Sequence, residues 1–405
     1  MSDLKLKSWV TMAASIALTA CVPNNANQAR QITIASPIAA DAGDFQAITG
    51  FDIYVDQGNL HAVITAQAAN SKQTLIGYLH SEDGGQSWSA VQNIGSGFNL
   101  PVESKLGNDI QIAASGKQRV VIWQTTGEIP GMGPLVTIYS NDDGQTWQRG
   151  SNPTGAEIDQ SHHDLAADAQ GQFHLVWLDD REENAYQGLR YARSADAGQH
   201  WQLSQTLDQS SCSCCWNRLL VNDQGQVNVL YRDMEFRDMA LAQSTNSGET
   251  WQRLSTVGEF NWKFEGCPHN GGGLSQAKDG EIHSVIWTGA ENQAGLYHLQ
   301  SADNGKSWSQ PQSVAAGSGA FHGDIAALDA QQVAMIWDAM GPEGSTVMLA
   351  DSMDNGKLWS IPLLLSSVGI SASYPRIVAT KNGWLALWTE QQADKTKHWL
   401  SAVIQ

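Results

Sequence analysis

The chain has 405 residues, of which 41% are hydrophobic, and its 41 Asp and Glu against 23 Lys and Arg give a formal net charge of -18. This apolar content is too high for a disordered chain, and the length is sufficient to bury a large core. An acidic surface would repel nucleic acid, so we exclude nucleic-acid binding.

The first 20 residues have the pattern of a signal peptide. Lys5 and Lys7 precede an apolar run over residues 9–17. This run has the length of a signal-peptide core and is too short to span a membrane as a mature helix. We therefore expect residues 1–20 to be removed.

The segment that follows points to lipidation. Residues 18–21, Leu-Thr-Ala-Cys, resemble the lipobox of bacterial lipoproteins, in which Cys21 becomes the first mature residue and carries the lipid. Ordinary secretory cleavage is the alternative. Residues 21–30 form a polar, lipidated tether. By the same resemblance, Val22 implies that the lipid anchors the protein in the outer membrane of the bacterial cell envelope.

Residues 31–405 are predicted to form one all-β domain, because helical periodicity is nearly absent and short apolar runs alternate with turn residues. An octapeptide occurs six times, as SEDGGQSW, SNDDGQTW, SADAGQHW, STNSGETW, SADNGKSW and SMDNGKLW, starting at Ser81, Ser140, Ser194, Ser244, Ser301 and Ser352. Its third residue can cap a turn, its glycine suits a positive φ, and its tryptophan can fill space between strands. We interpret these residues as structural.

The octapeptide resembles the Asp-box, or BNR repeat, of sialidases and related proteins, and the resemblance implies that residues 31–405 form a single β-propeller. The third positions of the first and last copies, residues 83 and 354, lie five repeats apart, or about 54 residues per repeat. The domain therefore has room for seven four-stranded blades, which we favour over six. Residues 31–36 (QITIAS) would supply the missing strand and close the ring.

The true sialidases that carry this Asp-box have six blades. They bind the substrate carboxylate through three arginines, aided by a tyrosine nucleophile, a glutamate and an aspartate. The segment that corresponds to the first arginine, residues 50–55, contains none. This departure argues against an intact sialidase triad.

A central funnel can be predicted, because the innermost strands of a propeller start at the face where the second strands end. These positions offer candidate ligand-binding residues: His162, His163, Asn217, Arg218, Arg232, His269, Asn270, His322 and Arg376. Candidate catalytic residues are Asp164, Asp180, Glu235, Asp324 and Tyr374, and the same positions include Trp216 and Asp338. Convergent His, Asp and Arg are typical of a binding or active site. A water-filled polar channel without chemistry is the alternative.

Four cysteines lie in two short segments: Cys212, Cys214 and Cys215 in SCSCCWN, and Cys267 in GCPHNGGG. Cys212 and Cys267 each stand 13 residues before the glycine of their blade's first hairpin, so the two loops should meet on adjacent blades. With YRDMEFRD at 231–238, the segments resemble a poorly characterised group of secreted Asp-box proteins. That resemblance implies a shared local site and supplies no reaction.

Two roles are open for these cysteines. An oxidising compartment favours a disulfide framework, and Cys212 with Cys267 is the expected pair. The alternative is a copper or zinc site formed by the thiolates and His269.

We expect a membrane-anchored, non-hydrolytic protein that binds a ligand, a metal ion or a partner, such as a glycan or a periplasmic protein, through the funnel. The alternative is an exo-acting glycoside hydrolase of the sialidase type. Three arginines that converge on one point would favour the hydrolase.

Overall fold

The structure of the chain is a computed structural model that describes residues 31–38, 43–68, 73–98, 100–155, 159–179, 187–222, 224–317 and 319–405. The expected signal peptide, Cys21 and the tether lie outside the described residues, as does Asp180. Within these ranges, no helix is long and apolar enough to cross a membrane.

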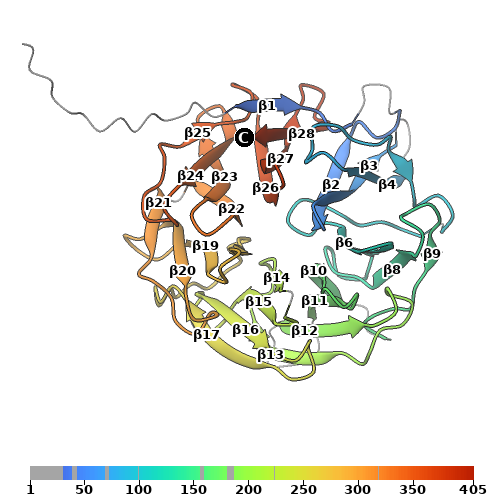
Figure 1. The fold of residues 1–405 in the computed structure, drawn as a ribbon, viewed down its shortest axis with the longest axis horizontal. Helices are drawn as coiled ribbons and strands as arrows, with labels where there is room; N and C mark the ends of the chain where they lie inside the picture. Colours follow the sequence, from blue (N-terminus) through green and yellow to red (C-terminus); the bar gives the residue numbers. More distant parts are fainter. Residues whose placement is uncertain are drawn as a thin grey trace, which may run out of the picture. The chain divides into compact units, whose positions relative to one another are not determined.

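The described residues form 28 strands in seven four-stranded antiparallel sheets, which are the blades of a ring (Figure 1). They include no helix. The predictions of an all-β propeller and of seven rather than six blades are confirmed. Blades 1 to 6 run in chain order from an innermost strand at the axis to an outer strand, whereas the outer strand of blade 7 is β1.

The first three blades take up residues 48–211. Blade 1 contains β2 (Ile48–Asp56), β3 (Asn59–Gln67), β4 (Thr74–Ser81) and β5 (Gln92–Asn93). Blade 2 contains β6 (Gln111–Ser115), β7 (Gln118–Gln124), β8 (Leu135–Ser140) and β9 (Gln148–Arg149). Blade 3 contains β10 (Gln160–Ala167), β11 (Phe173–Asp179), β12 (Gln187–Ser194) and β13 (Gln205–Ser211).

The remaining blades complete the ring. Blade 4 contains β14 (Arg218–Val221), β15 (Val227–Arg232), β16 (Met239–Ser244) and β17 (Gln252–Val257). Blade 5 contains β18 (Gly272–Gln276), β19 (Ile282–Thr288), β20 (Gly295–Ser301) and β21 (Gln312–Ala316). Blade 6 contains β22 (Ala320–Ala327), β23 (Val333–Gly341), β24 (Gly344–Ser352) and β25 (Leu363–Leu364). Blade 7 contains β26 (Ala372–Thr380), β27 (Gly383–Gln391), β28 (Lys397–Ile404) and β1 (Ile32–Ala35).

The ring closes where β1 pairs with β28 in antiparallel register, Ile32 opposite Ile404. The N–H of Gln405 donates to the carbonyl of Gln31 at 3.0 Å, which continues the ladder beyond both strands. The predicted closing strand is therefore confirmed. Two segments from opposite ends of the domain share one blade, so a sheet edge that would otherwise be exposed is paired.

The hydrophobic core lies between neighbouring blades. One buried cluster joins Val120 and Ile122 of β7 to Phe173 and Trp177 of β11, and two further clusters bridge blades 3 and 4 and blades 4 and 5 in the same way. The second strand of each blade is flanked by strands on both sides, which explains why β7, β11, β15 and β19 are almost entirely buried.

The six octapeptides form turns with one shared hydrogen-bond pattern. In the copy at Ser140, the serine hydroxyl donates to Asp142 (2.7 Å) and accepts the N–H of Gly144 (2.9 Å), while Asp142 accepts the N–H of Thr146 (2.9 Å). The other five copies repeat all three bonds. These residues act within the turn, as we interpreted them.

The glycine of each turn also lies against the preceding blade. A Cβ on Gly85 would meet Leu385 of blade 7 at 2.7 Å, and one on Gly144 would meet Tyr78 of blade 1 at 2.8 Å. Gly248 has a φ of +80°, and a Cβ there would overlap the hydroxyl of Tyr191 in blade 3. Positive φ and close approach together require glycine at this position.

We predict that Gly248→Ala destabilises the protein by about 3 kcal/mol, because backbone strain of about 1 kcal/mol adds to overpacking against Tyr191. Gly58→Ala is the matched control, because Gly58 has a φ of +82° with no atom within 4 Å of the added Cβ. Urea unfolding of the two variants separates strain from packing. Equal losses would show that the contact between blades contributes nothing.

Candidate functional site

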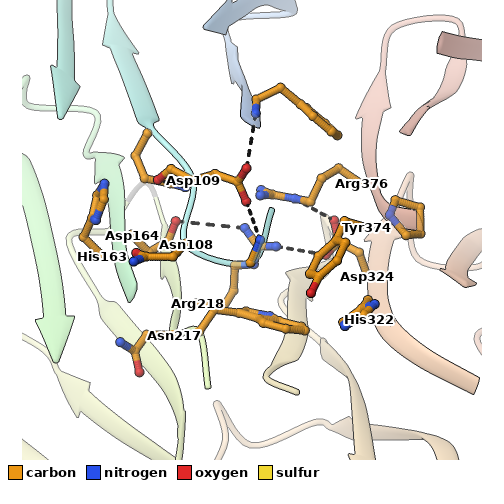
Figure 2. A pocket seen from close by; sticks show the side chains of 16 residues that line it. Asn108, Asp109, His163, Asp164, Asn217, Arg218, His322, Asp324, Tyr374 and Arg376 are labelled. Atoms are coloured by element: carbon orange, nitrogen blue, oxygen red, sulfur yellow. Dashed lines mark hydrogen bonds and ion pairs between the residues drawn. The ribbon is translucent and has the colours of Figure 1, made fainter. Parts of the chain in front are cut away.

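A pocket lies at the propeller axis, between the innermost strands (Figure 2). It contains about 570 Å³ of space, counting the open solvent at its mouth. Its lining comes from residues 51, 107–109, 111, 163–164, 216–218, 322–324 and 374–376. Six blades contribute, so the ring has to be complete for the pocket to exist.

Five charged residues meet at the axis, and we call them the axial ring: Asp52, Asp164, Arg218, Asp324 and Arg376. Arg376 contacts Asp52 through Nη1 and Asp324 through Nε, both at 3.2 Å. Arg218 contacts Asp324 at 3.4 Å and lies 4.0 Å from Asp164. Two arginines are thus shared among three carboxylates, and the fully ionised ring has one net negative charge.

The carboxylates of the axial ring also tie each blade to the next. One oxygen of each accepts a backbone N–H from the innermost strand of the following blade: Ile112 to Asp52 (3.0 Å), Leu219 to Asp164 (2.5 Å) and Ile377 to Asp324 (3.1 Å). Hydrogen bonds of this kind satisfy buried backbone donors that no strand ladder reaches. The ring therefore has a structural role in joining blades.

Burial raises the pKa of Asp52, Asp109 and Asp164. The pKa of Asp164 rises to about 6, although Arg218 opposes the shift. The pKa of Asp109 rises from 3.8 to about 7, because burial outweighs the N–H groups of Gly107 and Phe51, which donate to its oxygens. Loss of water disfavours the charged form of a carboxyl group more than these partners favour it.

Aromatic rings line one side of the pocket. The rings of His322 and Tyr374 stack with centroids 3.9 Å apart, and Trp216 lies 5.5 Å from His322. Nδ1 of His322 donates to Asp338 at 2.8 Å, which orients the imidazole. Burial, and then the charge of Asp338, raise the pKa of Tyr374 to about 12. Phenolate chemistry at Tyr374 is therefore disfavoured near neutral pH.

Eight of the predicted residues line this pocket: His163, Asp164, Asn217, Arg218, His322, Asp324, Tyr374 and Arg376. His162 and Asn270 support it from behind. The carbonyl of His162 accepts from Asn217 (2.9 Å), and Oδ1 of Asn270 accepts the N–H of His322 (3.1 Å).

Two predicted residues have other positions. Glu235 is exposed in the loop after β15 and does not line the pocket, contrary to the prediction. Arg232 was expected to bind a ligand, yet it is buried and its guanidinium donates to the carbonyls of Asn270 (2.9 Å), Trp287 (2.9 Å) and Arg237. Arg232 therefore holds together the segments that contain these three carbonyls. Its guanidinium is occupied by the protein and is not free to bind a ligand.

The sequence analysis missed Asp52, Phe51, Asn108 and Asp109. Residues 108 and 109 end an irregular segment that gives no strand signal. A usable signal existed for Asp52, because it precedes its octapeptide aspartate by about 30 residues, as do Asp164 and Asp324. Counting back by this distance from the first, third and sixth octapeptides leads to the three aspartates of the axial ring.

The cysteine segments form a second cluster on blades 4 and 5. Cys212 Sγ lies 3.7 Å from that of Cys214 and 3.5 Å from that of Cys215, and all three are buried. Cys214 also lies with the exposed Cys267 and His269, their ligand atoms within 4.8 Å of one another. Hydrogen bonds from Cys214 and Cys215 lower the pKa of the Cys212 thiol, whereas burial raises that of Cys215.

The expected disulfide between Cys212 and Cys267 is absent from the structure, in which all four cysteines are free thiols. The turn that follows β13 directs Cys212 toward Cys214 and Cys215, and Cys214 is the cysteine grouped with Cys267. The prediction that the two loops meet was correct, but the expected pairing was wrong.

The sequence profile of the BNR/Asp-box repeat matches residues 138–149, which contain the second octapeptide. A PL25 ulvan lyase has a TM-score of 0.58 at 11% identity, over 88% of this chain and 94% of that chain. The chain has the fold of the sialidase-like β-propellers. The structure of YCF48 bound to a D1 peptide has a TM-score of 0.53 at 13% identity, over 92% of this chain and 95% of that chain.

A point mutant of the NanB sialidase from Streptococcus pneumoniae gives a TM-score of 0.49 at 12% identity, over 91% of this chain and 69% of that chain. No curated protein sequence matches the chain. These likenesses describe the fold alone.

The raised pKa of Asp109 predicts a pH dependence of stability. Its folded pKa lies above 3.8, so the stability that the protonated carboxyl contributes is lost as the pH rises through about 7. We expect the melting temperature of the wild type to fall more steeply from about pH 5 to 8 than that of Asp109→Asn. Asp279→Asn, on the surface, controls for the lost charge. Parallel curves for Asp109→Asn and wild type would contradict the assignment.

Proposed function

We propose that the protein is a lipid-anchored binding protein of the bacterial cell envelope that holds a neutral sugar unit of a glycan in the axial pocket without hydrolysing it. The observation that carries the proposal is the set of polar atoms that the pocket residues leave unpaired. The alternative, an exo-acting sialidase-type hydrolase, is disfavoured by the arginines.

Four residues of the pocket lining each have a buried polar atom without a hydrogen-bond partner among the described residues. These atoms are Oε1 of Gln111, Nδ1 of His163, Oδ1 of Asn217 and Nε of Arg218. Nε2 of His163 faces the carbonyl of Ile122, so it carries the ring proton and Nδ1 is an acceptor. Three acceptors and one donor match hydroxyl groups, which both donate and accept.

The aromatic side of the pocket fits the same ligand. Trp216, His322 and Tyr374 present flat apolar faces next to polar groups. Ligand pockets commonly combine apolar and aromatic surface with a few placed polar groups that fix orientation. A pyranose ring has both an apolar face and hydroxyls at its edge.

The arginines argue against recognition of a sialic acid carboxylate. Two of them, Arg218 and Arg376, line the pocket among the described residues, and both already contact aspartates. An anion would have to displace those carboxylates from buried positions, which is costly. The raised pKa of Tyr374 also makes its hydroxyl a poor nucleophile.

The fold neighbours do not decide between ligand classes. Two of the neighbours with TM-scores above 0.5 differ in what they bind. The ulvan lyase is bound to -[GlcA(1-4)Rha3S]-, and YCF48 is bound to a D1 peptide. Propellers host unrelated functions, so the proposal depends on the residues of this pocket.

We expect the full-length protein in detergent to bind neutral oligosaccharides on a glycan array and to release no fluorophore from methylumbelliferyl sialoside. His322→Asn should weaken binding about tenfold or more, because the stacking surface is lost while asparagine tolerates the left-handed backbone at φ 50°. His200→Asn, in an exposed turn, should bind as wild type. Selective binding of sialylated glycans, or turnover of the sialoside, would overturn the proposal.

Membrane anchoring is the second part of the proposal, and residues 1–21 of the sequence support it. We expect Cys21→Ala to move the protein from the membrane fraction to the soluble envelope fraction and to abolish incorporation of radiolabelled palmitate. Cys267→Ala, a variant of an exposed cysteine, should leave both unchanged. Palmitate labelling that persists in Cys21→Ala would contradict lipidation at this residue.

A further inference from the structure

We propose that Cys212, Cys214 and Cys215 bind a Cu(I) ion, and that the ion enters through Cys267 and His269. This site is separate from the axial pocket and does not depend on the proposed sugar ligand. Three observations support it: the spacing of the sulfurs, the chemistry of the donors, and a route from the surface.

The sulfur spacing fits a shared metal ion. Two thiolates on one ion, with metal–sulfur bonds of about 2.3 Å, lie about 3.8 Å apart at tetrahedral angles and about 4.0 Å apart at the wider angles of a three-ligand site. The Sγ atoms here are separated by 3.7 and 3.5 Å, whereas disulfide sulfurs lie about 2.05 Å apart. The three sulfurs therefore surround a common point without being bonded to each other.

The donor set favours a soft ion. All three thiols are buried, and the side chain that packs against them is the thioether-bearing Met234. Neither of the two groups of ligand atoms found among the described residues contains a carboxylate. Thiolate and thioether donors suit Cu(I) and zinc, whereas oxygen donors suit harder cations. A structural zinc ion would take four ligands, and the buried group supplies three thiolates.

Cys214 connects the buried group to the surface. It belongs both to the buried trio and to the group with Cys267 and His269, which are exposed. An ion held by the exposed pair would need only successive ligand exchanges at Cys214 to reach the interior. The arrangement therefore provides the entry path that a buried metal site requires.

Arg232 holds the two cysteine loops in place before any ion is bound. Its carbonyl accepts the N–H of Cys212 at 2.8 Å, and its Nε donates to the carbonyl of Asn270, three residues after Cys267. A site whose supporting residues are already fixed loses little order on binding.

The test uses full-length protein purified without oxygen. Its free thiols are counted, and it is then loaded with tetrakis(acetonitrile)copper(I) and challenged with the Cu(I) chelator bathocuproine disulfonate. We expect four free thiols besides Cys21, one retained copper ion per chain, and an X-ray absorption spectrum with a sulfur shell. Ser213→Ala, an exposed position between the cysteines, should retain copper as wild type.

Two variants separate the parts of the site. Cys212→Ser with Cys215→Ser should lose at least ten-fold in copper retention, with circular dichroism and melting temperature as checks on folding. Cys267→Ser with His269→Asn should retain copper but load it more slowly, and both positions are exposed, so folding is not at risk.

Four results would overturn the assignment: no copper retained by the wild type, equal retention in the double cysteine variant, zinc retained where copper is released, or a thiol count that shows a disulfide among the four cysteines.

Discussion

The sharing of two arginines among three aspartates at the axis is the constraint on which the rest of the molecule depends. Buried charges are costly unless every one is paired and hydrogen-bonded. Each charge of the axial ring has an opposite charge within 4.0 Å, and Asp52 and Asp324 each contact Arg376 and also accept a backbone N–H from the next blade. These ion pairs therefore hold the innermost strands in position, because, among the described residues, no strand across the axis pairs with them through backbone hydrogen bonds.

The residues that join the blades are therefore largely different from those that we propose bind a ligand. The outer turns place a glycine against the preceding blade, β1 closes the circle on β28, and the axial ring joins the inner strands. Asp164 and Asp324, the obvious acids of the pocket, are occupied by these contacts and are poorly placed to transfer protons to a substrate. Under the proposed function, ligand binding is left to the aromatic side of the pocket and to atoms, such as those of Asn217 and His163, that have no hydrogen-bond partner among the described residues.

The repeat spacing was enough to predict seven blades and the closing strand, because a repeat of about 54 residues leaves room in the domain for one blade more than the six octapeptides. Most pocket residues, such as Arg218 and His322, were also predictable, since they stand at strand entries. Arg232 was misassigned because its partners are carbonyls that only the fold brings near. Likewise, spacing predicted that the cysteine loops meet, but the partner of each sulfur depends on the local turn at 212–215.

The most direct test of the structural role of the axial ring is a double-mutant cycle on the unfolding free energy of Asp52→Asn and Arg376→Met. Asp52 contacts Arg376 at 3.2 Å, and burial raises its pKa. The axial-ring account predicts that both single variants are strongly destabilised and that their coupling energy is on the order of 2 kcal/mol. Single variants within about 0.5 kcal/mol of wild type, without coupling, would contradict it.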